Sequence, residues 1–221
     1  VFDDVKSDPD IENCEACIDM AKAGNYDLIV GVGGGSPMDI ASIASVMCTN
    51  AGTVYDYFGV NLVKQPGIPT FLITTTAGTG AEVTPNAILT DHKDQLKKAI
   101  VSPYILPRAA VIDPELTLSM PPVVTSFTGM DALTHAIESY TSMNATPLTD
   151  MYAREGIRLI AQSLRTAVSK GEKLEARYDM SMGSLYAGIS LANAGVGAVH
   201  ALAYPLGGQF NVAHGIANGL L

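Results

Sequence analysis

The chain has 221 residues, of which 48% are apolar, 16% charged and 6% aromatic. This length and apolar content allow one large buried core or two smaller ones, so a disordered chain is excluded. The 22 acidic and 13 basic side chains leave a net charge of −9, which repels phosphate backbones and anionic lipids. We therefore expect neither a nucleic acid nor a membrane as partner.

Targeting and cysteine signals point to a soluble, cytoplasmic protein. No apolar run approaches the roughly 18 residues of a membrane span. The N-terminus lacks the basic residues followed by an apolar stretch that are typical of a signal peptide. Three cysteines do not form a disulfide framework. Cys14 and Cys17 form a C-x-x-C pair, but with Ile11 and Ile18 they follow one face of a helix. This pattern favours packing in a core over redox or metal chemistry.

The first segment predicts a helix, a strand, a glycine-rich turn and a second helix. The first helix is expected to end near Lys22, before Gly24-Asn25. In the apolar run 26–32, polar and apolar residues do not alternate, which predicts a strand buried on both faces of a parallel sheet. Residues 33–36 (Gly-Gly-Gly-Ser), which we term the glycine turn, come next, and Pro37 opens a helix to Met47.

The later pattern changes from strands to helices near residue 115. This change predicts a Rossmann-like α/β part with a mostly parallel sheet over 1–115, and an all-helical part over 116–221. Small polar residues at 74–80 form a second turn after a strand. The predicted strands are 68–74, 87–90, 97–102 and 109–113, and the predicted helices are 123–142, 148–169, 172–193 and 195–204.

Both turns suit a phosphate-bearing ligand. The glycine turn lies between a strand and a helix N-terminus, where free N–H groups and the helix dipole attract an anion. It matches neither the G-x-G-x-x-G nor the P-loop pattern. A tight turn with Ser36 as N-cap explains the same residues, and a hydroxyl-rich loop bonding its own backbone explains the second turn. Two such turns at strand ends together favour a nucleotide-type ligand.

A carboxylate and three histidines in the helical half form a candidate metal site. Asp131 and His135 are four residues apart, so they share one helix face. Pro205 and Gly207-Gly208 are expected to break the helix between His200 and His214, placing them on two elements. One carboxylate and three imidazoles suit Fe²⁺ or Zn²⁺. Ordinary buried or surface histidines are the alternative, because spacing alone does not show that the elements converge.

The chain carries five motifs along its length: Gly33 to Asp39, Thr75 to Thr84, Met120-Pro121-Pro122, Gly129 to Glu138, and His200 to Asn218. Together these motifs resemble those of the iron-containing (group III) alcohol dehydrogenases, in order and spacing over the whole chain. That resemblance implies an α/β dinucleotide-binding domain followed by a helical metal-binding domain, the architecture also found in dehydroquinate synthase. It implies reversible hydride transfer between a primary alcohol or aldehyde and NAD or NADP, in a homo-oligomer.

The resemblance also assigns residues to the site. It implies that the metal ligands are Asp131, His135, His200 and His214, with Fe²⁺ or Zn²⁺ as the ion. It implies that the dinucleotide, through its diphosphate and neighbouring groups, contacts the residues Gly34, Gly35, Ser36, Thr75, Thr79, Thr84 and Lys98.

Two departures from the family pattern carry expectations of their own. Many members have a histidine where this chain has Tyr204, so Tyr204 becomes the candidate proton carrier, although tyrosine titrates near 10. Family members also begin earlier and end later, which predicts that the chain is a fragment lacking both ends. The alternatives are a zinc-dependent enzyme like glycerol dehydrogenase, and an inactive truncated form that only binds nucleotide.

Overall fold

The computed structural model describes residues 1–210, 212 and 214–221, without the side chains of 204, 208 and 209. By its internal contacts the chain divides into two compact units. The first unit comprises Val1–Thr74 and Pro85–Val111, and the second comprises Thr75–Thr84 and Ile112–Leu221. Residues 75–84 therefore group with the helices, although they precede residue 115.

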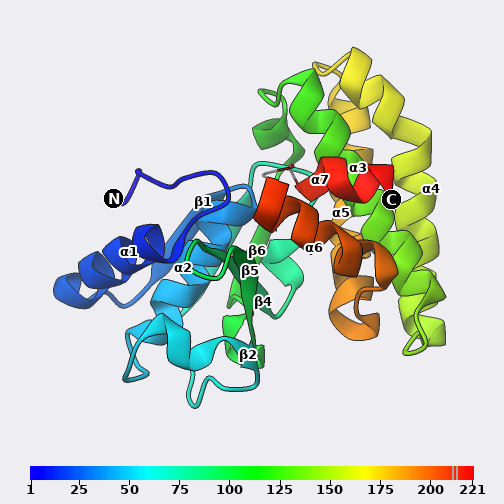
Figure 1. The fold of residues 1–221 in the computed structure, drawn as a ribbon. Coiled ribbons are helices and arrows are strands. Elements are labelled where there is room, and N and C mark those ends of the chain that lie inside the picture. The colour runs from blue at the N-terminus through cyan, green and yellow to red at the C-terminus, as the bar shows by residue number, and fades with distance from the viewer. Residues whose placement is uncertain (211, 213) are drawn as a thin grey trace. The chain divides into compact units, whose positions relative to one another are not determined.

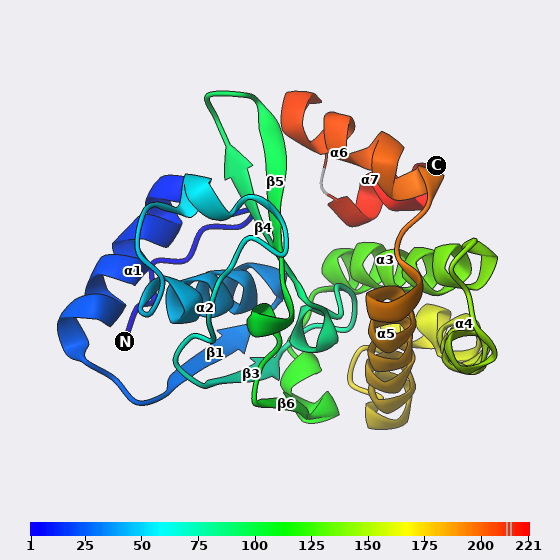
Figure 2. The ribbon, with the colours of Figure 1, turned by 90° about the horizontal axis from the view of Figure 1, so that it is seen from below.

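The first unit contains two small sheets (Figures 1 and 2). In one sheet the strand order is β1-β3-β6, and β1 pairs with β3 in parallel, with Ile29 opposite Thr70 and Gly33 opposite Thr74. In the other the order is β2-β5-β4, and β4 and β5 form an antiparallel hairpin. The elements are α1 (Ile11–Gly24), β1 (Ile29–Gly33), α2 (Gly35–Met47), β2 (Gly59–Val60), β3 (Thr70–Thr74), β4 (Asn86–Asp91), β5 (Leu96–Val101) and β6 (Ala109–Ile112).

Helix α1 ends at Gly24, close to the predicted end near Lys22, and a side chain caps its start. The Asp10 side chain accepts a hydrogen bond from the Asn13 N–H at 2.7 Å, which caps the N-terminus. Asn25 adopts the left-handed conformation (φ 48°) that ends the helix. Cys14 and Cys17 are buried in the core that α1 forms with α2, β4 and β5. The prediction that these cysteines pack in a core is confirmed.

Strand β1 is covered on one face only, so the prediction of two buried faces is wrong. Helix α2 packs closely on the face of Gly31, where a Cβ atom would lie 2.9 Å from that of Ala41. On the other face Val30 is 49% exposed and Val32 is 54% exposed. Phe71 of β3, which lies opposite Val30 in the sheet, is 38% exposed. An unbroken apolar run does not reveal how many faces of a strand are covered.

The second unit is built from helices (Figure 1). Helices α3, α4 and α5 pack against one another, α7 packs on α3, and α6 contacts both α7 and α3. This packing brings the last two helices of the chain to the helix that carries Asp131 and His135. The helices are α3 (Pro122–Thr141), α4 (Pro147–Ser169), α5 (Leu174–Ala194), α6 (Ala198–Phe210) and α7 (His214–Leu220).

Helix α6 passes through Pro205 and Gly207-Gly208, so the predicted break at these residues is wrong. Proline removes one backbone hydrogen bond from a helix, but intrinsic preferences are weak beside tertiary packing. Here the packing of α6 against α7 and α3 outweighs them. Helix α6 ends at Phe210 instead, and α7 begins at His214. Helix α7 itself was not predicted.

Within the described residues, no helix by itself combines the length and apolar composition of a membrane span. The bent pair Leu174–Ala194 and Ala198–Gly207 meets those criteria only when its two helices are taken together.

Candidate functional site

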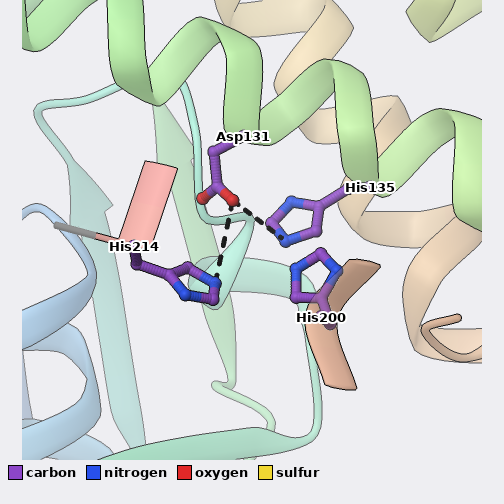
Figure 3. Close-up of side chains that lie close together, drawn as sticks. All are labelled: Asp131, His135, His200 and His214. Carbon is purple, nitrogen blue, oxygen red and sulfur yellow. Dashed lines mark ion pairs between the residues drawn. The ribbon is translucent and has the colours of Figure 1, made fainter. Parts of the chain in front are cut away.

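Asp131, His135, His200 and His214 converge in the second unit (Figure 3). Each offers one ligand atom, and these atoms all lie within 4.8 Å of one another. The Asp131 Oδ1 atom is 3.7 Å from His135 Nε2 and 3.8 Å from His214 Nε2. Asp131 and His135 are one turn apart on α3, as predicted, while His200 comes from α6 and His214 from α7.

The charges of this cluster suit a cation. Burial raises the pKa of Asp131, but His135, His214 and the Asn218 amide outweigh it, so the pKa lies below its ordinary value. Burial lowers the pKa of His135 despite the opposing effect of Asp131. At neutral pH the cluster therefore contains an ionised carboxylate and a neutral imidazole at His135. These are the protonation states in which both groups bind a metal ion.

Two polar residues beside the cluster were not predicted. The Asn218 Nδ2 atom lies 2.6 Å from Asp131 Oδ1, 3.1 Å from His200 Nε2 and 3.2 Å from His214 Nε2. Glu138 bonds the far ring nitrogen of His200. Spacing carried a signal for both: Glu138 follows Asp131 by seven residues, and Asn218 follows His214 by four, so each lies on the ligand-bearing face of its helix.

Tyr204, the candidate proton carrier, belongs to α6, but its side chain lies outside the described part of the structure. Its role stays a prediction.

The glycine turn forms the N-terminus of α2. Gly33 adopts φ 148°, in the region that favours glycine, and a Cβ there would lie 2.6 Å from Pro37 Cγ. Gly34 is the N-cap and makes no side-chain hydrogen bond, so the predicted cap by Ser36 is wrong. The Ser36 hydroxyl instead accepts from the Asp8 N–H at 3.3 Å. The first N–H groups of α2 thus lack a side-chain cap, which leaves them suited to an anion.

Lys98 and its neighbour Lys97 differ in their surroundings. Lys98 Nζ lies 2.8 Å from Asp91 Oδ2 and also pairs with Asp94. Lys97 pairs with Asp8, the residue whose N–H bonds Ser36. Adjacent residues on a strand face opposite sides, which explains the difference. Lys97 is thus linked to the glycine turn through Asp8, while the assignment of Lys98 to the cofactor site stays a prediction.

Thr75, Thr79 and Thr84 lie in the segment 75–84, which belongs to the second unit, whereas the glycine turn belongs to the first. Thr79 Oγ1 accepts from the Ala81 N–H at 3.3 Å, and Thr84 is buried. Within this segment Glu82 is buried at 3% exposure, and burial raises its pKa to about 7. The roles of the threonines toward a cofactor stay predictions.

The Glu82→Gln variant is expected to be more stable than the wild type near pH 8 and equally stable near pH 4. Between pH 4.5, the ordinary pKa, and about 7, folded Glu82 holds a proton that the unfolded chain releases, so the free energy of unfolding falls as pH rises. Glutamine has no such proton to lose. Thermal unfolding of both proteins from pH 4 to 8 measures the difference, and a difference that does not change with pH would contradict it.

Residues 1–114 match the family described as iron-containing alcohol dehydrogenase, and residues 125–221 match its C-terminal family. The chain belongs to the iron-containing alcohol dehydrogenase family. The fold expected from the sequence, an α/β part with a parallel sheet followed by a helical part, is confirmed.

Individual members of the family are similar over the full chain. Long-chain-alcohol dehydrogenase 1 of Geobacillus thermodenitrificans is 47% identical over 100% of this chain and 56% of its own. The structure of 1,3-propanediol oxidoreductase has a TM-score of 0.95 at 42% identity, covering 98% of this chain and 57% of its own. Sulfoacetaldehyde reductase from Bifidobacterium kashiwanohense, solved with NAD⁺, has a TM-score of 0.94 at 36% identity. The match covers 100% of this chain and 59% of the reductase chain. This chain thus spans little more than half the length of these relatives.

Proposed function

We propose that this chain forms the metal- and nucleotide-binding part of a dehydrogenase. The enzyme would transfer a hydride reversibly between a primary alcohol or its aldehyde and NAD or NADP. The convergence of one carboxylate and three imidazoles from α3, α6 and α7 carries this proposal. Membership of the iron-containing family and the NAD⁺ complex of a relative support it.

The donor set fits divalent iron or zinc. Nitrogen and carboxylate ligands suit both ions, and the buried Asp131 carboxylate needs a positive partner. Asp131, His135, His200 and His214 would hold the ion, and the Asn218 amide orients Asp131. When bound, such an ion supplies Lewis-acid chemistry, which polarises an alcohol or carbonyl oxygen.

The glycine turn is the proposed binding site for the diphosphate of the dinucleotide. The N–H groups of Gly35 and Ser36 lie in the first turn of α2, at the positive end of its dipole. Gly34 adds no side chain there, so the backbone can approach a phosphate closely. Thr75, Thr79, Thr84 and Lys98 are proposed as further contacts on the resemblance to family positions.

Hydride transfer also requires movement of the hydroxyl proton of the alcohol. Tyr204 is the proposed carrier, passing this proton toward water, because its phenol can both accept and donate a hydrogen bond. No protein carboxylate is needed as base in this scheme.

Loading and stripping the metal tests the function. Protein purified without oxygen and loaded with Fe²⁺ or Zn²⁺ is expected to oxidise 1,3-propanediol or a longer primary alcohol with NAD⁺ or NADP⁺. Stripping with a chelator should abolish turnover, and re-addition of metal should restore it. NADH binding, followed by fluorescence, should survive stripping because the glycine turn contains no ligand of the ion.

Unchanged turnover after complete loss of metal would contradict the proposal. NADH binding without turnover of any alcohol in the loaded protein would favour the alternative of an inactive nucleotide-binding form.

A further inference from the structure

Glu138 is a buried carboxylate that the proposed metal site does not use as a ligand. It lies on α3, three residues after His135, and is 5% exposed. Its two oxygens face the start of α6. Oε1 accepts from the Val199 N–H at 2.7 Å, and Oε2 bonds Nδ1 of His200. Both oxygens of this buried carboxylate therefore form hydrogen bonds with the start of α6, the helix that carries the proposed ligand His200.

The bond to His200 fixes which ring nitrogen holds the proton. An ionised carboxylate only accepts hydrogen bonds, so Nδ1 of His200 must be the donor. In a neutral ring the lone pair is then on Nε2. That atom is on the cluster side, 3.1 Å from Asn218 Nδ2. Neutral imidazole whose Nε2 carries no proton is the form that binds a divalent cation through that atom.

Glu138 also fixes the backbone before His200. A Cβ atom on Gly197 would lie 2.8 Å from Glu138 Oε1, so the chain passes directly against the carboxylate. Together with the Val199 bond, this contact sets where α6 begins. His135 has no comparable support, since its buried Nδ1 makes no hydrogen bond of good geometry, although the Gly78 backbone lies nearby.

We propose that Glu138 is a positioning residue that presents Nε2 of His200 to the metal ion. The inference rests on the proposed function, because it presumes that the four-residue cluster holds a cation. Carboxylate partners of this kind orient metal-binding histidines and set their tautomer, and their loss typically lowers metal affinity by roughly 10- to 100-fold.

Cobalt binding in the Glu138→Gln variant tests the inference. Glutamine keeps the shape but has one acceptor oxygen for two donors, so it cannot serve both Val199 and His200. Titration with Co²⁺, followed by its visible absorption, should show affinity reduced roughly 10- to 100-fold relative to wild type. The control is Glu155→Gln on α4, an exposed carboxylate that pairs with Arg158 and should bind cobalt as wild type does.

Nitrogen-15 spectra of the metal-free wild type give a second readout that does not depend on a variant folding. The His200 ring should carry a proton on Nδ1 and none on Nε2, and Glu138→Gln should shift it toward a mixture of tautomers. Equal cobalt affinity in Glu138→Gln and wild type, or a proton on Nε2 in the wild type, would overturn the inference alone. A wild type that binds no cobalt would overturn the metal site itself, and this inference with it.

Discussion

Replacing Asp131 with asparagine is expected to abolish high-affinity metal binding while leaving the metal-free protein folded. Asp131 is the one anionic ligand of the described cluster, and its carboxylate is 3% exposed. Asparagine keeps the shape and an oxygen for the Asn218 amide, which lies at 2.6 Å, but it carries no charge. The loss of affinity for Co²⁺ should exceed the roughly 10- to 100-fold typical of residues that only support a ligand.

Thermal unfolding gives an independent measure of the same effect. A metal that binds only the folded state stabilises it by about 2.7 kcal/mol at a hundred times its dissociation constant. The wild type should therefore unfold at a higher temperature with metal, and Asp131→Asn should not. Asp179→Asn on α5 is the matched control, since Asp179 bonds Ser163 and lies outside the cluster. A metal-induced shift in Asp131→Asn equal to that of wild type would contradict the assignment.

Replacing Gly215 with alanine is expected to disrupt the cluster without touching a ligand. Gly215 follows His214 on α7, and a Cβ there would lie 2.3 Å from the backbone oxygen of Phe127 on α3. Backbone of a helix cannot yield as a flexible side chain can, so α7 must move away from α3. His214 and Asn218 would move with it. We expect a loss of roughly 1–3 kcal/mol in the free energy of unfolding, as for other overpacked sites, together with weakened cobalt binding.

Gly219→Ala is the control for this prediction, because it lies one turn further along the same helix. A Cβ at Gly219 would lie 3.4 Å from Met130 Cβ, which is close to ordinary contact. This variant should bind cobalt as wild type does, and alanine favours the helix more than glycine. Cobalt titration and thermal unfolding of the two variants measure the difference. Equal behaviour of Gly215→Ala and Gly219→Ala would contradict the close approach of α7 to α3.

Sequence spacing predicted the part of the site that lies within one helix. Asp131 and His135 share a face of α3 because a helix repeats every 3.6 residues, and the structure confirms this. The approach of His200 and His214 depends on how α6 and α7 pack on α3, and this packing has no local signal. The break between the two helices was predicted at Pro205, but packing outweighs the cost of proline, and α6 continues through this residue.

In the α/β part, too, some features were predicted from the sequence and others were not. The order of strand, glycine turn and helix was predicted from residues 26–47 and is confirmed. The cap by Ser36 was wrong because the helix begins one residue earlier than the hydroxyl-bearing residue, at Gly35. The exposed face of Val30 was missed as well, because an apolar run has the same appearance whether one or both faces are covered.

Location of the metal by anomalous diffraction tests the central claim most directly. Crystals of the protein loaded with Fe²⁺ or Zn²⁺, measured at the absorption edge of the metal, should show one strong peak within bonding distance of Asp131, His135, His200 and His214. A peak beside Cys14 and Cys17, or full metal content with no peak among the three imidazoles, would contradict it.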